Sequence, residues 1–178
     1  MTFQADLLER AVAQPLADDE QPLEAARWRL AFQPEVFFLG RTEGAGLVRD
    51  PLGRIVRRCS VTTQGQINAA RGSLELEEVY AYDDGEIDVW RWAMTAGRDG
   101  RYVVAEAKAG VASAAERQGD DYLVVFRRPY RRATGAFAPR YAARFSLLSA
   151  DTTLKRADIS LYGVPLGSLT AVHRKVEG

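Results

Sequence analysis

The sequence predicts a mainly β protein, an antiparallel up-and-down β-barrel of about ten strands with short helices at its N-terminus. From residue 35 onward, apolar and β-branched residues alternate in segments that are separated by turn signals. No connection between these segments is long enough for a crossover helix, so neighbouring strands are expected to be antiparallel. So many strands usually close into a barrel or pack as a sandwich, which removes their exposed edges. Long strands in simple sequence order favour the up-and-down barrel over a Greek-key sandwich.

Two domain-level segments are expected: residues 1–34 as a helical segment that caps the barrel, and residues 35–178 as the barrel. Apolar residues recur at helical spacing in residues 3–14, and residues 22–33 carry a second apolar face behind Pro22. Pro34 is expected to end this second helix because proline disrupts a helix interior.

The expected strands follow in order, each bounded by a turn. Asp50–Gly53 has Pro at its second position, and residues 83–85 read Asp-Asp-Gly, which is typical of a hairpin. The strands are expected at residues 35–48, 54–67, 73–82, 86–95, 101–109, 111–117, 122–128, 135–149, 154–162 and 165–175.

Composition excludes several function classes. The 178 residues contain 24 Lys+Arg and 24 Asp+Glu, so the net charge is zero, which disfavours a dedicated nucleic-acid binder. One Cys, Cys59, excludes an internal disulfide, and one His, His173, excludes a multi-histidine metal site. We expect no cofactor and no metal.

The N-terminus has the features of neither a signal peptide nor a membrane span. Asp6, Glu9 and Arg10 interrupt the apolar residues there, and no window approaches the ~20 apolar residues of a membrane helix. The sequence therefore predicts a cytoplasmic protein without an integral membrane segment.

Three segments resemble an uncharacterised bacterial family of lipocalin-like (calycin-type) domains, many of whose members are predicted lipoproteins. They are FFLGRTEGAGLVRDPLGRIVRR (37–58), LELEEVYAYDDGE (74–86) with WRW (90–92), and KRADISLYGVPLGSLT (155–170). The resemblance implies a calycin-type barrel and no assigned activity. We expect this chain to depart from the family in its leader, its lipid-attachment Cys and the acidic, aromatic segment before the KRA motif, so the resemblance does not imply functions that depend on these.

One strand places a carboxylate among apolar residues. Glu78 shares a face with Leu76, Tyr80 and Tyr82, and a buried carboxylate needs a partner. Arg91 and Arg156 are the expected partners, and Trp90 or Trp92 would hold an apolar tail. The pocket hypothesis therefore comprises Glu78, Tyr80, Tyr82, Arg91, Trp92 and Arg156. The alternatives are a structural ion pair or a strand register in which Glu78 faces solvent.

A basic stretch follows Asp121, and no acidic residue occurs again before Asp151. It is interpreted as a mobile cationic loop over residues 127–141, and Arg127, Arg128, Arg131 and Arg132 are the candidate anion-binding residues. The alternative is a solvated charged face. Residues 73–90 are acidic, so the two segments are expected to lie on opposite sides or to pair across a homodimer.

His173 and the glycines carry weaker hypotheses. His173 would be the axial ligand if the barrel bound haem, as in nitrobindin-type barrels, but the following Arg174 and Lys175 favour an exposed position at the barrel rim. The pattern of Gly40, Gly44 and Gly46 lacks the Lys-Ser/Thr of a phosphate loop, so a bulge or a sharp strand bend is expected there.

The leading functional hypothesis is non-catalytic binding of a small apolar or amphipathic ligand. An isomerase or hydratase that uses Glu78 or Tyr80 as acid or base, and a protein-interaction adaptor, are the alternatives. A connected apolar cavity of at least ~300 Å³ would support ligand binding, whereas a filled interior would contradict both binding and catalysis.

Overall fold

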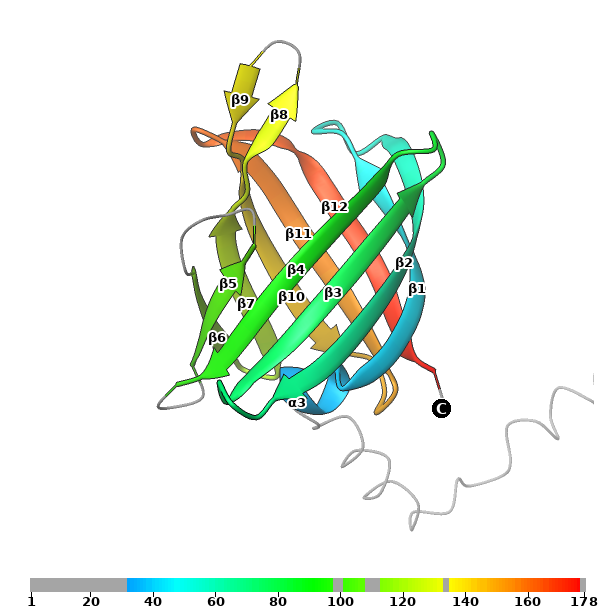
Figure 1. Cartoon of the computed structure of the whole chain (residues 1–178). Helices are drawn as coiled ribbons and strands as arrows, with labels where there is room; N and C mark the ends of the chain where they lie inside the picture. The colour runs from blue at the N-terminus through cyan, green and yellow to red at the C-terminus, as the bar shows by residue number, and fades with distance from the viewer. Residues whose placement is uncertain (1–31, 98–100, 108–112, 133–134, 177–178) are drawn as a thin grey trace, which may run out of the picture.

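The protein folds into a closed antiparallel barrel of ten strands, which confirms the fold class expected from the sequence (Figure 1). The structure is a computed structural model that describes residues 32–97, 101–107, 113–132 and 135–176. The expected helices at 3–14 and 22–33 lie almost entirely outside these ranges, so the helical cap over residues 1–34 stays a prediction.

The elements follow the chain as a short helix and twelve strands in the described ranges. They are α3 (Pro34–Phe37), β1 (Gly40–Arg49), β2 (Ile55–Asn68), β3 (Ser73–Tyr82), β4 (Ile87–Ala96), β5 (Tyr102–Glu106), β6 (Ser113–Gln118), β7 (Asp121–Arg127), β8 (Tyr130–Arg132), β9 (Gly135–Phe137), β10 (Arg140–Leu147), β11 (Thr152–Leu161) and β12 (Val164–Lys175).

Each barrel strand pairs with the next barrel strand along the chain, and β12 returns to pair with β1. This is the up-and-down order, which removes every exposed sheet edge. Strands β8 and β9 form a separate two-stranded hairpin between β7 and β10, and it projects beyond one end of the barrel (Figure 1). The connection that the sequence suggested to be a mobile loop is thus a β-hairpin.

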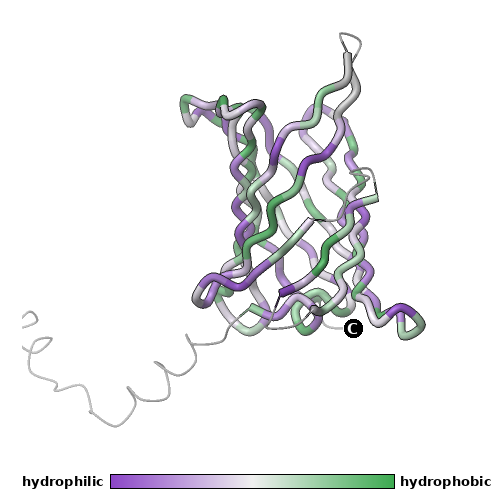
Figure 2. Tube along the Cα trace, turned by 90° about the vertical axis from the view of Figure 1, so that its left-hand side faces the viewer, coloured by the Kyte–Doolittle hydropathy of each residue, from purple (hydrophilic) through white to green (hydrophobic). Residues whose placement is uncertain are grey.

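Alternation along the strands divides the wall into an inner and an outer face. Hydrophilic and hydrophobic residues alternate along the tube in the side view (Figure 2). Strand β4 shows this clearly, because Trp90, Trp92 and Met94 are buried while Arg91 between the two Trp residues is exposed. Side chains on one strand point alternately to opposite faces, so residues two apart share the interior.

An aromatic plug closes the barrel end that lies opposite the hairpin. Helix α3 lies across this end (Figure 1), and Phe37 and Phe38 are buried together with Phe32. The ring of Phe32 stacks on Phe145 of β10 with centroids 5.4 Å apart. Tyr102 of β5 donates a 2.5 Å hydrogen bond to Glu35 of α3 and so ties the helix to the wall.

The first expected strand, which was expected to begin at residue 35, is wrong by several residues at its start. Pro34 begins the short helix α3, since proline is well tolerated in the first turn. Strand β1 begins only at Gly40, whose φ of +89° turns the chain from the helix into the sheet.

Close approach between strands explains the glycines of β1. A Cβ atom on Gly44 would lie 1.7 Å from the carbonyl oxygen of Val172, and one on Gly46 would lie 2.8 Å from that of Thr170. Both positions therefore serve the close contact between β1 and β12, which pair without a register shift from Thr42 to Arg49.

Candidate functional site: two compartments in one barrel

Strand β4 carries two Trp residues that each donate an indole N–H to a buried or half-buried carboxylate. Trp92 donates to Glu78 at 2.8 Å, and Trp90 donates to Asp88 at 2.6 Å. Each carboxylate in turn pairs with a buried cation from the far side of the barrel. These two sets occupy different depths of the interior, and each is associated with its own cavity.

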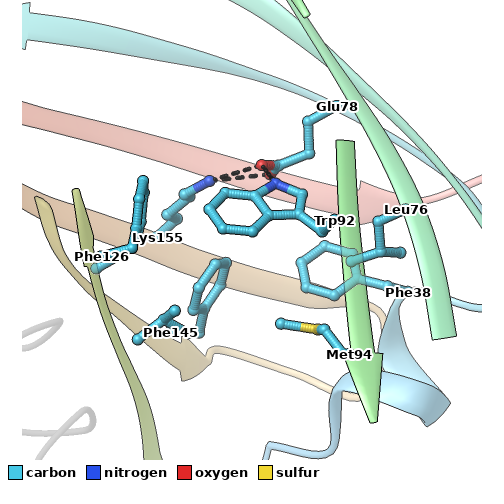
Figure 3. A pocket seen from close by; sticks show the side chains of 10 residues that line it. Phe38, Leu76, Glu78, Trp92, Met94, Phe126, Phe145 and Lys155 are labelled. Carbon is cyan, nitrogen blue, oxygen red and sulfur yellow. Dashed lines mark hydrogen bonds and ion pairs between the residues drawn. The ribbon is translucent and has the colours of Figure 1, made fainter. Parts of the chain in front are cut away.

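The inner set is centred on Glu78 and Lys155 (Figure 3). The Lys155 ammonium lies 3.0 and 2.9 Å from the two carboxylate oxygens of Glu78 and 2.9 Å from the hydroxyl of Tyr80. Both charged side chains are sealed from solvent, with exposed fractions of 1% and 3%. Glu78 thus faces the interior, as one interpretation of its strand expected.

Small residues give Lys155 room to cross the barrel from β11 to β3. Its neighbour across the sheet is Ala171 on β12, and the residue opposite Ala171 is Gly46 on β1. Directly paired residues share one face of a sheet, so Ala171 and Gly46 leave space on the side of Lys155 that faces β12 and β1. The long Lys155 side chain fills that space and brings its ammonium to Glu78.

The pKa values of Glu78 and Tyr80 are shifted in the directions that favour an ion pair between Glu78 and Lys155. Burial raises the pKa of Glu78, but the Lys155 charge and the hydrogen bonds from Lys155 and Trp92 outweigh it and hold that pKa below its ordinary value. Burial and the neighbouring Glu78 carboxylate raise the pKa of Tyr80 well above the usual range. Glu78 is therefore ionised and Tyr80 is protonated near neutral pH.

A small inner cavity lies beside this set. Its volume is about 20 Å³, room for about one water molecule. Every residue around it is buried. They are Phe38, Leu76, Glu78, Trp92, Met94, Val124, Phe126, Ala143, Phe145 and Lys155. The inner half of the barrel is consequently a packed core around a sealed ion pair.

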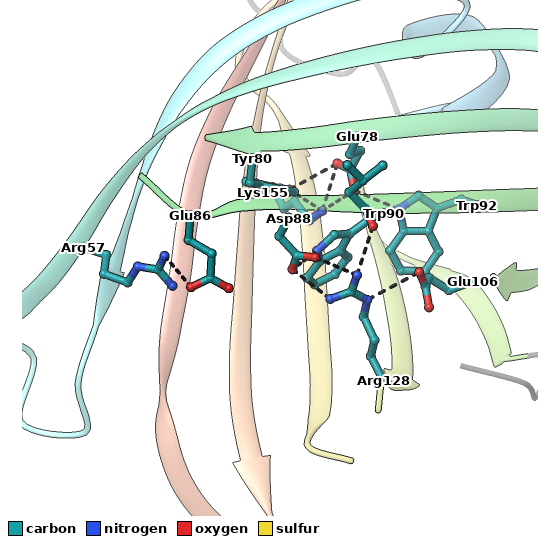
Figure 4. Close-up of polar contacts among 11 residues, drawn as sticks. Arg57, Glu78, Tyr80, Glu86, Asp88, Trp90, Trp92, Glu106, Arg128 and Lys155 are labelled. Carbon is teal, nitrogen blue, oxygen red and sulfur yellow. Dashed lines mark hydrogen bonds and ion pairs between the residues drawn. The ribbon is translucent and has the colours of Figure 1, made fainter. Parts of the chain in front are cut away.

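The outer set is centred on Arg128 and Asp88 (Figure 4). Two guanidinium nitrogens of Arg128 each lie 2.8 Å from an oxygen of Asp88, and a third lies 3.4 Å from Glu106. The Arg128 guanidinium also lies over the Trp90 ring at 4.6 Å, a cation–π distance. Arg128 is 2% exposed, whereas the Asp88 side chain keeps 14% exposure.

A much larger pocket opens at the barrel mouth, the end that carries the hairpin. Its volume is about 600 Å³, and Val56 and Leu166 on its border are exposed, so the pocket is open to solvent. We call it the mouth pocket. Its lining is Val48, Val56, Arg57, Tyr82, Asp88, Trp90, Phe137, Pro139, Tyr141, Ile159, Leu161, Leu166 and Leu169.

An aromatic layer separates the two cavities. Phe126 stacks on Tyr141 with ring centroids 5.0 Å apart, and it lies perpendicular to the rings of Trp92 and Trp90, with centroid distances of 4.7 and 5.6 Å. Trp90 and Tyr141 border the mouth pocket, whereas Phe126 and Trp92 border the inner cavity. The layer therefore forms the floor of the mouth pocket.

The expected partners of Glu78 are wrong. Arg91 lies on the outer face and pairs with Glu77 at 2.7 Å, and Arg156 is 68% exposed next to Asp158. Both stand one residue out of phase with the inward positions of their strands, so neither reaches the interior. Of the other pocket candidates, Glu78, Tyr80 and Trp92 belong to the inner set and Tyr82 borders the mouth pocket.

The four arginines expected in a mobile loop occupy different environments. Arg128 is not a free cation but a buried ion-pair residue, because it continues the inward phase of β7. Arg127 is exposed and donates to the carbonyl oxygen of Ala138. Arg131 and Arg132 belong to β8, and their side chains lie outside the described part of the structure.

The expected rim position of His173 is also wrong. His173 is fully buried, with its ring edge-on to Phe38 at 5.9 Å, and within the described ranges neither ring nitrogen has a hydrogen-bond partner. Burial lowers its pKa to about 4. His173 borders neither cavity, so nothing in the geometry favours the haem alternative.

Sequence reasoning missed Lys155, Asp88 and Glu106. A usable signal existed for the first two, since Lys155 shares its alternation with Ala157 and Ile159, and Asp88 shares that of Trp90 and Trp92.

Within the described ranges, no group of three or more His, Cys, Asp or Glu side chains is placed to hold a metal ion. No helix in the same ranges is long and apolar enough to cross a membrane.

Residues 18–175 match the family DUF3833, described as a protein of unknown function, and the chain belongs to this family. No curated protein matches the sequence. Among solved structures, the S-type phycobiliprotein lyase CPES from Guillardia theta is similar, with a TM-score of 0.61, 9% identity and coverage of 87% of this chain and 98% of that chain.

A second similar structure is a DUF3598-family protein of unknown function from Nostoc punctiforme. Its TM-score is 0.62 at 14% identity, and the match covers 83% of this chain and 51% of that chain. At these identities the two structures establish a shared barrel fold.

Proposed function

We propose that this DUF3833 protein binds a small apolar or amphipathic molecule in the mouth pocket and does not transform it chemically. The observation that carries the proposal is the pocket of about 600 Å³ at one barrel end, opposite the end that α3 closes. Pockets of this size suit a small organic ligand.

The lining supports an apolar ligand body. Ile159, Leu161 and Leu169 form one wall with Val48, and Trp90 lies at the floor. Burying apolar surface is favourable at roughly 25 cal/mol per Å². A ligand of moderate size would therefore gain much of its affinity from this wall and floor alone.

The alternative of acid–base catalysis has less support. Glu78 and Tyr80 are within 3.3 Å of each other, but both are committed to Lys155 and lie behind the aromatic layer. The inner cavity beside Glu78 has room for about one water molecule. A substrate in the mouth pocket would not meet either candidate acid or base without rearrangement of the floor.

The test measures binding of the neutral fluorescent dye N-phenyl-1-naphthylamine to the purified protein. We expect saturable binding in the micromolar range, and we expect Ile159→Trp to weaken it at least tenfold because the larger ring occupies the pocket. The matched control is Arg156→Trp on the outer face of the same strand, which is expected to leave the affinity within twofold.

A companion experiment identifies the natural ligand by native mass spectrometry of protein from its own host. An apolar or amphipathic molecule should co-purify and should be lost in Ile159→Trp. Failure of the dye to bind, or equal loss in Ile159→Trp and Arg156→Trp, would contradict the proposal.

A further inference from the structure

One cation on the wall of the mouth pocket has hydrogen-bonding capacity that the protein does not use. Arg57 on β2 lines the pocket, and one of its terminal nitrogens donates to Asp84 at 2.7 Å and to Glu86 at 2.9 Å. Its Nε is buried and has no hydrogen-bond partner within the described ranges. A buried donor without an acceptor is unfavourable and rare, so it calls for an explanation.

The guanidinium of Arg57 is held in place from two sides. Asp84 and Glu86 in the β3–β4 turn form ion pairs with it, and Figure 4 shows the contact with Glu86. On the other side, the Cζ atom of Arg57 lies 3.7 Å from the centroid of the Tyr82 ring. The Arg57 side chain is only 23% exposed. Tyr82 itself lines the mouth pocket. The unused donor thus belongs to a positioned group, not to a freely moving surface side chain.

We propose that Arg57 is the polar anchor of the mouth pocket and receives an uncharged acceptor oxygen of an amphipathic ligand, such as an alcohol, ester or ketone. This inference rests on the proposed function. The apolar part of the ligand would lie along Ile159 and Leu169, and its oxygen would accept from the Arg57 guanidinium after a small rotation of that group.

Local charge favours an uncharged oxygen over a carboxylate. Arg57 is already paired with Asp84 and Glu86, so the three groups carry a formal charge of −1. The other charged residue in the pocket lining, Asp88, has its own cation in Arg128. A carboxylate ligand would meet an excess of negative charge among these groups, whereas a neutral acceptor satisfies Nε without repulsion.

The experiment displaces the dye N-phenyl-1-naphthylamine with 1-decanol and with decanoate at pH 8, where decanoate is ionised. In the wild-type protein we expect 1-decanol to bind more tightly than decanoate. Arg57→Met should weaken 1-decanol about tenfold, the loss expected for one hydrogen bond to a charged donor, after correction for the dye affinity of the variant, which is measured by direct titration.

The matched control is Arg54→Met, which removes an exposed arginine of the β1–β2 turn that pairs with Asp50 outside the pocket. It should change neither affinity. Tighter binding of decanoate than of 1-decanol would overturn the preference for a neutral oxygen, and an unchanged 1-decanol affinity in Arg57→Met would overturn the anchor. Absence of dye binding to the wild type would overturn the proposed function and this inference with it.

Discussion

The two halves of the barrel interior contain the same arrangement of side chains in different surroundings. Trp92, Glu78 and Lys155 form a sealed set beside a cavity of about 20 Å³, whereas Trp90 and Asp88 of the outer set line a pocket of about 600 Å³. In each set an indole and a cation hold one carboxylate. The difference lies in what surrounds the set: ten buried residues in the first case, and solvent-reachable space in the second.

With the ligand in the mouth pocket, as proposed, stability and binding would be divided between the two halves. Changes at the inner set should alter the free energy of unfolding and leave ligand affinity unchanged, whereas changes in the mouth pocket should do the reverse.

The largest effect is expected for Lys155→Met. The substitution leaves the Glu78 carboxylate buried without its cation, which should cost about 3–5 kcal/mol of unfolding free energy, measured by urea denaturation. The double variant Glu78→Gln with Lys155→Met removes both charges and should recover most of the loss. If Lys155→Met cost less than about 1 kcal/mol, the pair would not be sealed as described.

The second effect concerns pH and His173. In the unfolded chain this histidine takes up a proton near pH 6.5, but in the folded protein it stays neutral until about pH 4. The unfolded state therefore binds more protons in this window, and stability falls as the pH drops through it. Between pH 7 and 4.5 the expected loss is about 2–3 kcal/mol.

His173→Met is the variant that isolates this contribution. It should remove the part of the pH dependence between pH 7 and 4.5 that comes from the histidine, as measured by urea denaturation at several pH values. Glu78 loses its own contribution only as the pH falls below its ordinary pKa of 4.5, outside this window. An identical slope in the wild type and His173→Met would contradict the burial of the neutral ring.

A third effect comes from filling the inner cavity. Ala143 on β10 is buried beside it, and Ala143→Leu should overpack the core and cost about 1–3 kcal/mol. The dye affinity of the mouth pocket should stay within twofold. A change of affinity as large as that of Ile159→Trp would show that the two halves are not independent.

The smallest effect is expected for Arg91→Ala. Arg91 pairs with Glu77 on the outer face with side chains 63% and 45% exposed, so its loss should change stability by less than about 1 kcal/mol. Dye binding should not change. A marked loss of binding would restore the sequence-based hypothesis that Arg91 belongs to the ligand pocket.

The alternation of the strands was sufficient to predict the barrel and most strand positions. The same alternation also indicates which charged residues face the barrel interior. Arg91 and Arg156 are out of phase with Trp92 and Lys155, so the period of two already places the first pair outside and the second pair inside. His173 shares the phase of Leu169 and Ala171, which overrides the charged residues that follow it.

Other features could not be predicted from local pattern. Glu78 and Lys155 are 77 residues apart and sit on strands that are not neighbours, so their contact depends on barrel closure and on the small residues between them. Whether a barrel of this size is filled or open depends on how all its inner side chains pack. The aromatic layer under the mouth pocket is a result of that packing.

The most direct test of the division uses the indole N–H signals of protein labelled with ¹⁵N-tryptophan. The chain has three Trp residues, and Trp90→Phe and Trp92→Phe assign two of the three signals. On titration with N-phenyl-1-naphthylamine, we expect the Trp90 signal to shift strongly because its ring borders the mouth pocket, while the Trp92 signal stays nearly unchanged. A Trp92 shift equal to or larger than that of Trp90 would contradict the account.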